Sequence, residues 1–129
     1  MSAKVKLTVM EGNHAIKELI YNYRTMGIVG RAHNCYLQLP TDDEHRVVSR
    51  HHCLLDIDPP DIRVQDLGSR NGTYLNGRRI GRRPVTQAAE DVDPDAGPSY
   101  LVTEGDEIRV GHTILRVGVQ SSSDDEGAN

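Results

Sequence analysis

Residues 49–77, SRHHCLLDIDPPDIRVQDLGSRNGTYLNG, decide the fold class of this chain. The segment CLLDI places Cys53, Leu55 and Ile57 on one face, and the segment IRVQDL alternates in the same way. Apolar residues that recur every second position are typical of half-buried strands. Pro59-Pro60 separates the two segments, so they are expected to form neighbouring strands joined by a short turn.

Other short segments of the chain carry the same pattern. KVKLTVM, GIVGR and CYLQL read as strands, and DEIRVGHTILRVGV reads as two strands joined at Gly111-His112. VTQAAEDV is the only candidate for a helical turn. Many short strands separated by turn signals predict an all-β protein, an antiparallel β-sandwich with no substantial helix.

Glycine-rich pairs and biased segments divide the chain further. Asn71-Gly72 and Asn76-Gly77 are both expected to supply the positive φ angles of type I′ turns. Residues 82–100, rich in Pro, Ala, Asp and Gly, are expected to form a long, mobile surface loop. We expect a single domain over residues 1–120, followed by a disordered acidic tail over residues 121–129.

Composition narrows the possible partners. A length of 129 residues fits one domain, and a net charge of −4 argues against nucleic acid as a general partner. The first 14 residues, MSAKVKLTVMEGNH, contain no apolar run suited to a signal peptide or a membrane span, so we expect a reduced, cytoplasmic setting. Twelve of the 15 basic residues are Arg, whose planar fork fits phosphate and carboxylate oxygens.

The polar residues of the opening stretch first suggest catalysis. Ser49, His51 and His52 resemble parts of a hydrolase triad. However, neighbouring residues of an extended chain point to opposite faces, and the chain has no Gly-x-Ser-x-Gly elbow. The Asp residues are scattered through turns, so no paired-carboxylate centre is indicated. We therefore expect no enzyme activity.

A metal site is the second possibility. His33, Cys35, His51, His52 and Cys53 are potential zinc ligands. Structural zinc favours Cys or His pairs that are two to four residues apart and that wrap around the ion. His52 and Cys53 are adjacent, with opposed side chains, so only one of them joins the others readily. Buried cysteines and a histidine that supports loops are the simpler interpretation, and neither a metal nor a cofactor is expected.

Anion binding is the third possibility, and it matches the residue types. A phosphate monoester near pH 7 presents three acceptor oxygens and a charge between −1 and −2. Gly30-Arg31, Ser49-Arg50 and the run Ser69-Arg70-Asn71-Gly72 supply forked cations, hydroxyls and turn amides in three separate segments. If the strands before these segments end at one edge of the sandwich, the three converge on one site.

The motifs GIVGR, SRHH, DLGSRNGTYLNG and EGDEIRVG together resemble the signature of the forkhead-associated (FHA) domain. They occur in the family's order between residues 19 and 119, and four motifs in sequence are far more specific than one. The resemblance implies a β-sandwich without enzyme activity. It also implies that loops at one end bind phosphothreonine in partner proteins.

The resemblance assigns roles to individual residues. Arg31 corresponds to the family's phosphate-pairing arginine, and Ser49 to the serine whose hydroxyl donates to the phosphate. Arg50 follows it, at a position near the phosphate or the peptide backbone. Asn71 corresponds to the asparagine that binds the main chain of the peptide.

Two further residues of the expected phosphopeptide site, Ser69 and Arg70, occupy the loop before that asparagine. Arg70 departs from the family pattern, which commonly has a small hydroxyl residue at this position. The resemblance implies structural roles for a buried histidine and for turn residues: Gly30, His52, Gly68, Gly72, Asn76 and Gly77.

The sequence thus predicts a module that binds phosphothreonine peptides and mediates phosphorylation-dependent protein–protein interaction in signalling. The expected partner is a phosphothreonine-containing protein, such as a Ser/Thr kinase or its substrate. Binding to nucleic acid or to a membrane is not expected. Two alternatives stay open at this point. One is a phosphate-independent scaffold on the same fold, and the other is a zinc-binding regulatory protein.

Overall fold

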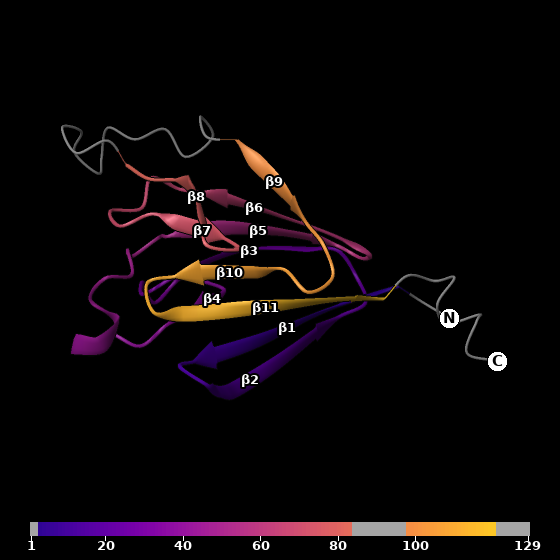
Figure 1. The fold of residues 1–129 in the computed structure, drawn as a ribbon, viewed down its shortest axis with the longest axis horizontal. Coiled ribbons are helices and arrows are strands. Elements are labelled where there is room, and N and C mark those ends of the chain that lie inside the picture. The colour runs from indigo at the N-terminus through magenta and orange to yellow at the C-terminus, as the bar shows by residue number, and fades with distance from the viewer. Residues whose placement is uncertain (1–2, 84–97, 121–129) are drawn as a thin grey trace.

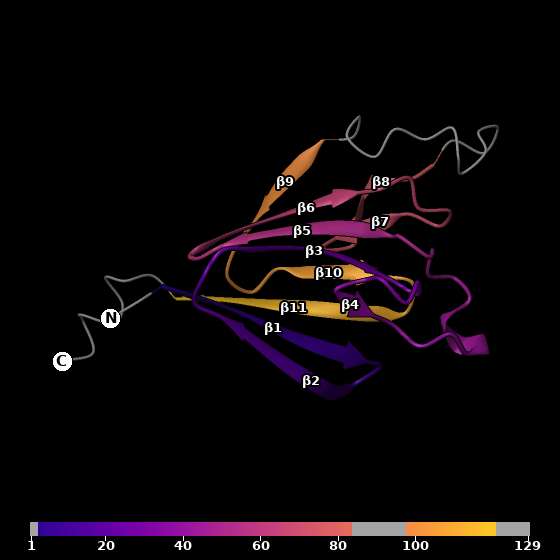
Figure 2. The same cartoon turned by 180° about the vertical axis from the view of Figure 1, so that it is seen from behind.

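Two β-sheets packed face to face form the protein (Figures 1 and 2). The structure, a computed structural model, describes residues 3–83 and 98–120. The fold is the predicted all-β sandwich, and its helical content in these residues is a single 3-10 turn, η1 (Asp43–His45). The expected helical turn at VTQAAEDV and the tail over 121–129 lie outside the described residues.

One sheet has six strands and the other has five. The six-stranded sheet runs in the order β2 (His14–Tyr21), β1 (Lys4–Glu11), β11 (Thr113–Gln120), β10 (Glu107–Val110), β7 (Thr73–Leu75) and β8 (Arg78–Gly81). The five-stranded sheet runs in the order β4 (Leu37–Gln38), β3 (Thr25–Gly30), β5 (Cys53–Asp58), β6 (Asp61–Asp66) and β9 (Ser99–Val102). Neighbouring strands are antiparallel except β3 and β4, which are parallel.

Alternating aliphatic residues fill the space between the sheets. Leu7 and Leu115 from the six-stranded sheet, and Ile57 and Ile62 from the five-stranded sheet, are almost completely buried. The chain has no Phe or Trp, so branched aliphatic side chains provide nearly all of this core. Their β-branched and γ-branched shapes suit a pleated surface, which explains why the period-two pattern predicted the strands well.

The strand predictions were wrong in two places. CYLQL forms only the two-residue strand β4, and Tyr36 stays outside it with its side chain exposed. Conversely, β9 begins at Ser99, inside the segment expected to be loop, and pairs with β6. The local sequence SYLV does not indicate a strand. It forms one because pairing with the neighbouring strand β6 supplies its backbone hydrogen bonds.

The two Asn-Gly pairs differ in conformation. Asn76 and Gly77 have φ angles of 51° and 82° and join β7 to β8 in the predicted type I′ hairpin. In the other pair only Gly72 has a positive φ, of 93°. The type I′ prediction for Asn71-Gly72 was wrong because β6 and β7 belong to different sheets, so the connection crosses the sandwich and forms no hairpin.

Asp66, the last residue of β6, shapes the beginning of this crossing. One carboxylate oxygen accepts the backbone N–H groups of Gly68 (2.9 Å) and Ser69 (3.1 Å). The other accepts the hydroxyls of Thr73 (2.7 Å) and Ser69. A methyl group added at Gly81 on β8 would lie 2.5 Å from Cβ of Asp66, so glycine is needed there to let the two strands approach.

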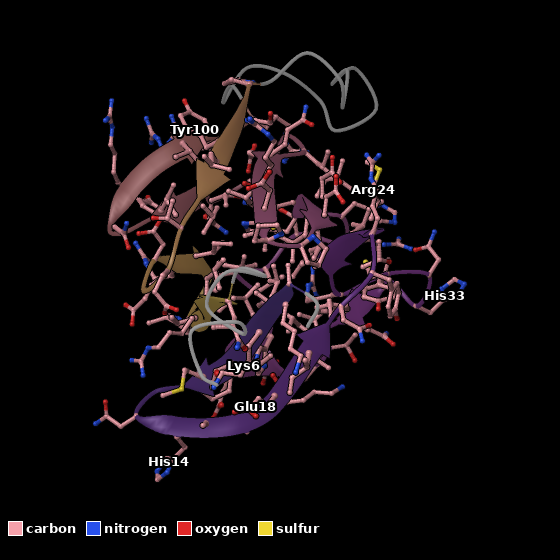
Figure 3. The ribbon with its side chains drawn as sticks, turned by 90° about the vertical axis from the view of Figure 1, so that its right-hand side faces the viewer. Lys6, His14, Glu18, Arg24, His33 and Tyr100 are labelled. Atoms are coloured by element: carbon pink, nitrogen blue, oxygen red, sulfur yellow. The ribbon has the colours of Figure 1, made fainter. Side chains whose placement is uncertain are left out.

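The connections β3–β4, β4–β5 and β6–β7 lie at one end of the sandwich (Figure 1). At the other end β1 begins and β11 ends, with Lys4 opposite Gln120. Figure 3 views that end, where Lys6 of β1 pairs with Glu18 of β2 at 3.7 Å. No helix in the described part of the chain is long and apolar enough to cross a membrane.

We predict that Asp66→Ala lowers the free energy of unfolding by about 3 kcal/mol or more. Hydrogen bonds to a charged group contribute about 1.5–3 kcal/mol each, and this substitution leaves several buried donors without an acceptor. Urea denaturation measures the loss. The matched control, Asp61→Ala, removes an exposed carboxylate at the start of the same strand and should change the value by no more than about 0.5 kcal/mol. Equal effects of the two substitutions would contradict this role of Asp66.

Candidate anion-binding site

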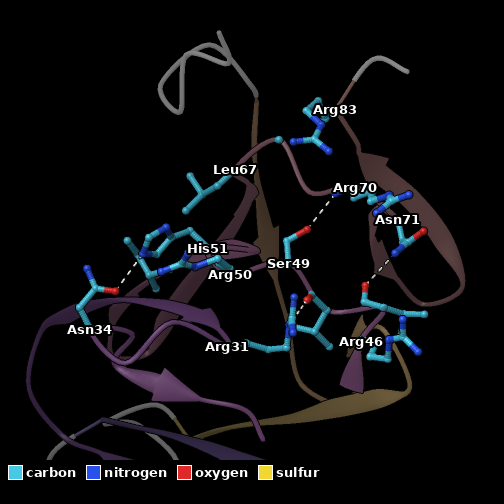
Figure 4. Close-up of a pocket in the computed structure, with 14 residues that line it drawn as sticks. Arg31, Asn34, Arg46, Ser49, Arg50, His51, Leu67, Arg70, Asn71 and Arg83 are labelled. Atoms are coloured by element: carbon cyan, nitrogen blue, oxygen red, sulfur yellow. Dashed lines mark hydrogen bonds between the residues drawn. The ribbon is translucent and has the colours of Figure 1, made fainter. Parts of the chain in front are cut away.

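A pocket of about 790 Å³ opens at the end of the sandwich where the three connections meet (Figure 4). Its lining comes from β3 and the residues after it, from the β4–β5 and β6–β7 connections, and from Arg83, which follows β8. The residues with polar side chains in this lining are Arg31, Asn34, Arg46, Ser49, Arg50, His51, Arg70, Asn71 and Arg83.

His52 links the chain segments that line this pocket. Its side chain is completely buried. Ring Nδ1 accepts the backbone N–H of Ser49 (3.0 Å), and Nε2 donates to the carbonyl oxygen of Gly72 (2.8 Å). Its own backbone N–H donates to Val29 of β3 (2.8 Å), and its carbonyl oxygen accepts from Leu67 (3.0 Å). One residue therefore fixes β3, the β4–β5 connection and the β6–β7 connection relative to one another.

The environment of His52 keeps its ring neutral. Burial lowers the pKa of the imidazole, and the weaker opposing effects of the Gly72 carbonyl and Asp66 do not reverse this. Because Nδ1 is occupied by the N–H of Ser49, and Nε2 carries the proton given to Gly72, neither nitrogen is free to take a proton from the Ser49 hydroxyl. The arrangement holds loops and contains no nucleophile–base pair.

Gly30 allows the first two motifs to touch. A methyl group at this position would lie 2.1 Å from the carbonyl oxygen of Arg50 and 2.7 Å from its carbonyl carbon. The backbone N–H of Arg31 then donates to Ser49 (3.2 Å), and that of Ala32 donates to Arg50 (3.0 Å). The chain after β3 is thereby bound directly to the chain before β5.

The Arg31 side chain is held by the same connection. Its Nε donates to the carbonyl oxygen of Val48, which anchors the guanidinium group and leaves both terminal nitrogens without a partner among the described residues. Two parallel N–H donors on a fixed plane suit the oxygens of a phosphate or carboxylate.

Ser49 and Asn71 are also oriented, each with one group left unused. The Ser49 hydroxyl oxygen accepts the backbone N–H of Arg70 (2.9 Å), so its proton remains available to an acceptor in the pocket. The Asn71 side-chain amide donates to the carbonyl oxygen of Val47 (2.9 Å), and its oxygen has no donor within the described residues. The pocket thus offers a hydroxyl donor beside an amide acceptor.

The short helix η1 anchors the β4–β5 connection on its other side. His45 lies between Asp42 (Nδ1 to Oδ1, 2.6 Å) and Glu11 of β1 (Nε2 to Oε1, 3.0 Å). Burial opposes the charged imidazole, but the hydrogen bonds and charges of the two carboxylates outweigh it and raise the pKa of His45. Arg46 follows directly and is therefore carried on an anchored turn.

Five arginines line the pocket: Arg31, Arg46, Arg50, Arg70 and Arg83. No Asp or Glu is among the described residues that line it. This concentration of positive charge occurs in a chain of net charge −4. The site is suited to an anion with several oxygen acceptors.

The structure brings five of the six expected phosphopeptide residues together. Arg31, Ser49, Arg50, Arg70 and Asn71 all line the pocket. Ser69 does not: it is completely buried, and its hydroxyl donates to Asp66, so its side chain holds the connection in shape. The expectation that Ser69 faces a ligand is corrected on this ground.

Several lining residues were not expected from the sequence. Nε2 of His51 donates to the side-chain oxygen of Asn34 (2.9 Å), and the two residues form one wall of the pocket. Arg46 and Arg83 lie on opposite sides of Ser49 in Figure 4. The position of Arg46, three residues before Ser49, could have indicated that it lies at the site. The position of Arg83 in the pocket depends on the path of the chain after β8, which the sequence does not indicate.

The zinc alternative gains no support from the geometry. Within residues 3–83 and 98–120, no group of three or more His, Cys, Asp or Glu side chains is placed to hold a metal ion. Both ring nitrogens of His52 are used. Burial raises the pKa of the Cys53 and Cys35 thiols, which disfavours the thiolate form that binds metals.

The protein is a β-sandwich, and the connections at one end build an arginine-lined pocket that contains a serine and an asparagine. This combination is typical of a domain that binds an anionic ligand. More specifically, this chain belongs to the FHA domain family, whose model matches residues 27–92. Members of this family are interaction modules.

Three relatives illustrate the similarity. The chain is 33% identical over 82 residues to the glycogen accumulation regulator GarA of Mycolicibacterium smegmatis, which covers 64% of this chain. It is 34% identical over 79 residues to the human angiogenic factor with G patch and FHA domains 1, which covers 60% of this chain. A solved structure described as "Structural and functional analysis of phosphothreonine-dependent FHA domain interactions" matches with a TM-score of 0.66 and 23% identity, over 91% of this chain and 97% of that one.

The matched region spans 41% of the mycobacterial relative and 10% of the human one. The likeness to these proteins therefore concerns the FHA domain and not their full length. The solved structure, at 23% identity, supports the fold.

We predict that Gly30→Ala disturbs the pocket, because the added methyl group collides with backbone atoms of Arg50. Overpacking of this kind costs about 1–3 kcal/mol, which urea denaturation measures. The backbone amide signals of Arg31 and Ala32 in an 15N NMR spectrum should also shift, because their hydrogen bonds to residues 49 and 50 lengthen. The matched control is Gly118→Ala, whose methyl group meets only ordinary contacts of 3.6 Å or more. Unchanged Arg31 and Ala32 signals in Gly30→Ala would contradict the close approach.

Proposed function

We propose that this protein binds phosphothreonine peptides and so mediates phosphorylation-dependent protein–protein interaction in signalling. One observation carries the proposal. Arg31, Ser49 and Asn71 line one pocket whose described lining contains no carboxylate, and the terminal nitrogens of Arg31, the hydroxyl proton of Ser49 and the side-chain oxygen of Asn71 have no partner among the described residues.

Arg31 and Ser49 are the phosphate ligands in this proposal. The guanidinium fork of Arg31 donates two hydrogen bonds to phosphate oxygens, and the Ser49 hydroxyl donates a third. Both groups are fixed before the ligand arrives, by Val48 in one case and by the N–H of Arg70 in the other. Less conformational entropy is then lost on binding.

Asn71 and the neighbouring arginines bind the rest of the peptide. The Asn71 oxygen accepts a main-chain N–H of the ligand, because its amide nitrogen is already committed to Val47. The side chains of Arg50 and Arg70 add positive charge around the phosphate. Ser69 contributes only to the shape of the connection.

We further propose that the protein binds its ligand without chemically changing it. Hydrolysis of a phosphoester or an acyl group needs a base beside a nucleophile. His52, which contacts the backbone of Ser49, holds its ring nitrogens on the Ser49 N–H and the Gly72 carbonyl oxygen, and burial lowers its pKa. His51, which lines the pocket, hydrogen-bonds to Asn34.

The proposed partner is a protein that a Ser/Thr kinase has phosphorylated, or such a kinase itself. Recognition of the phosphate makes the interaction depend on the activity of that kinase. We propose that this interaction takes place in the cytoplasm.

We predict that Arg31→Ala weakens phosphothreonine binding by one to two orders of magnitude. Each charge-assisted hydrogen bond contributes about 1.5–3 kcal/mol, and about 1.4 kcal/mol corresponds to a tenfold change in affinity. Isothermal titration calorimetry measures the change with a phosphothreonine peptide selected from a degenerate library, and with its unphosphorylated form as the reference.

The matched control is Arg24→Ala. Arg24 is exposed and pairs with Asp56 (3.3 Å) at the far end of the sandwich (Figure 3), so its loss should leave the affinity unchanged. Equal binding of the phosphorylated and unphosphorylated peptides would favour a phosphate-independent scaffold. Full affinity in Arg31→Ala would remove Arg31 from the site.

A further inference from the structure

The pocket carries more positive charge than one phosphate group needs. Five guanidinium groups line it, whereas a phosphothreonine carries at most two negative charges. Among the described residues, the side chains of Arg46, Arg50, Arg70 and Arg83 make no ion pair with any Asp or Glu. By contrast, Arg24 and Arg116 elsewhere on the molecule pair with Asp56 and Glu107.

The size of the pocket also exceeds a single phosphate group. Pockets of about 300–1,000 Å³ hold whole small-molecule ligands, and this one measures about 790 Å³. A phosphate seated on Arg31 and Ser49 therefore leaves room for neighbouring side chains of the peptide within the same ring of arginines.

Two of the arginines form a second group on one side of Ser49. The backbone N–H of Arg70 donates to the Ser49 hydroxyl (2.9 Å). The backbone N–H of Arg83 donates to the carbonyl oxygen of Ser69 (2.7 Å), which brings the end of β8 against the same connection. Figure 4 shows Arg70 and Arg83 on the side of Ser49 that faces away from Arg31.

The anchoring of both backbones matters for recognition. Two like charges placed close together repel one another, and this repulsion is relieved when an anion lies between them. Because Arg70 is tied to Ser49 and Arg83 is tied to Ser69, their side chains start from fixed points beside the phosphate position. An anionic group one or two residues from the phosphothreonine reaches them, since an extended chain advances about 3.3 Å per residue.

We infer that the pocket selects a doubly anionic segment, in which a second oxyanion within two residues of the phosphothreonine binds Arg70 and Arg83. This inference rests on the proposed function and names the ligand class of the same site. The second oxyanion is a phosphate or a carboxylate, because both accept the forked donors of arginine.

Titration calorimetry with one peptide series tests the inference. The parent is the library-selected peptide with a single phosphothreonine and Ala at the two positions on either side. Each of these four positions is then replaced in turn by phosphothreonine or by Glu. We expect at least one position at which the second anion raises the affinity about tenfold or more. A gain with phosphate alone identifies a second phosphorylation as the source, and an equal gain with Glu identifies an acidic flank.

Arg83→Ala, measured with the peptides that carry and lack the second anion, completes a double-mutant cycle between protein and ligand, and Arg82→Ala is its control. Arg82 precedes Arg83 and does not line the pocket, so Arg82→Ala should keep the tenfold gain. In Arg83→Ala the gain should fall below about threefold. A persistent gain in Arg83→Ala would overturn the assignment of the second oxyanion to this side of the pocket.

The two levels of the proposal fail in different ways. If the parent peptide binds and no second anion improves binding at any position, the inference is wrong and the proposed function stands. If the parent peptide binds no better than its unphosphorylated form, the proposed function itself is wrong.

Discussion

The hydrogen bonds of His52 are the constraint on which the rest of the site depends. A neutral, fully buried imidazole accepts from Ser49 and donates to Gly72, while the backbone of the same residue is bonded to Val29 and Leu67. A sandwich leaves the relative positions of its end connections undetermined, because each connection follows from a different strand. The imidazole removes this freedom, and its burial keeps it in the single protonation state that allows both bonds.

Around the neutral His52 the polar side chains of the pocket are arranged so that each keeps at least one hydrogen-bonding atom unused. Arg31 is fixed through Nε, Ser49 through its oxygen and Asn71 through its nitrogen, and in each case the residue lines the pocket with further polar atoms that have no partner among the described residues. Preorganised donors of this kind exchange hydrogen bonds with water for hydrogen bonds with a ligand, with little ordering cost. The net negative charge of the whole chain gives no hint of this basic pocket.

The sequence predicted the sandwich well because its strands alternate cleanly, as in Cys53, Leu55 and Ile57. The resemblance to the FHA domain, together with the positions of these residues beside predicted strands, also indicated that Arg31, Ser49 and Asn71 meet at one end of the sandwich, and all three line the pocket. The sequence did not reveal what depends on three-dimensional pairing. β9 forms because it pairs with β6. The conformation of Asn71-Gly72 follows from the crossing between the sheets. Ser69 is buried with its hydroxyl bonded to the carboxylate of Asp66. Arg83 enters the pocket only because its backbone is bonded to Ser69.

A titration followed by 15N NMR tests the central claim that three connections form one anion-binding site. Addition of a library-selected phosphothreonine peptide should move the backbone amide signals of Arg31, Ser49, Arg50, Arg70 and Asn71 together, with one common dissociation constant. The unphosphorylated peptide should leave them in place. Largest changes on β2 or β9, or the same changes with both peptides, would contradict the account.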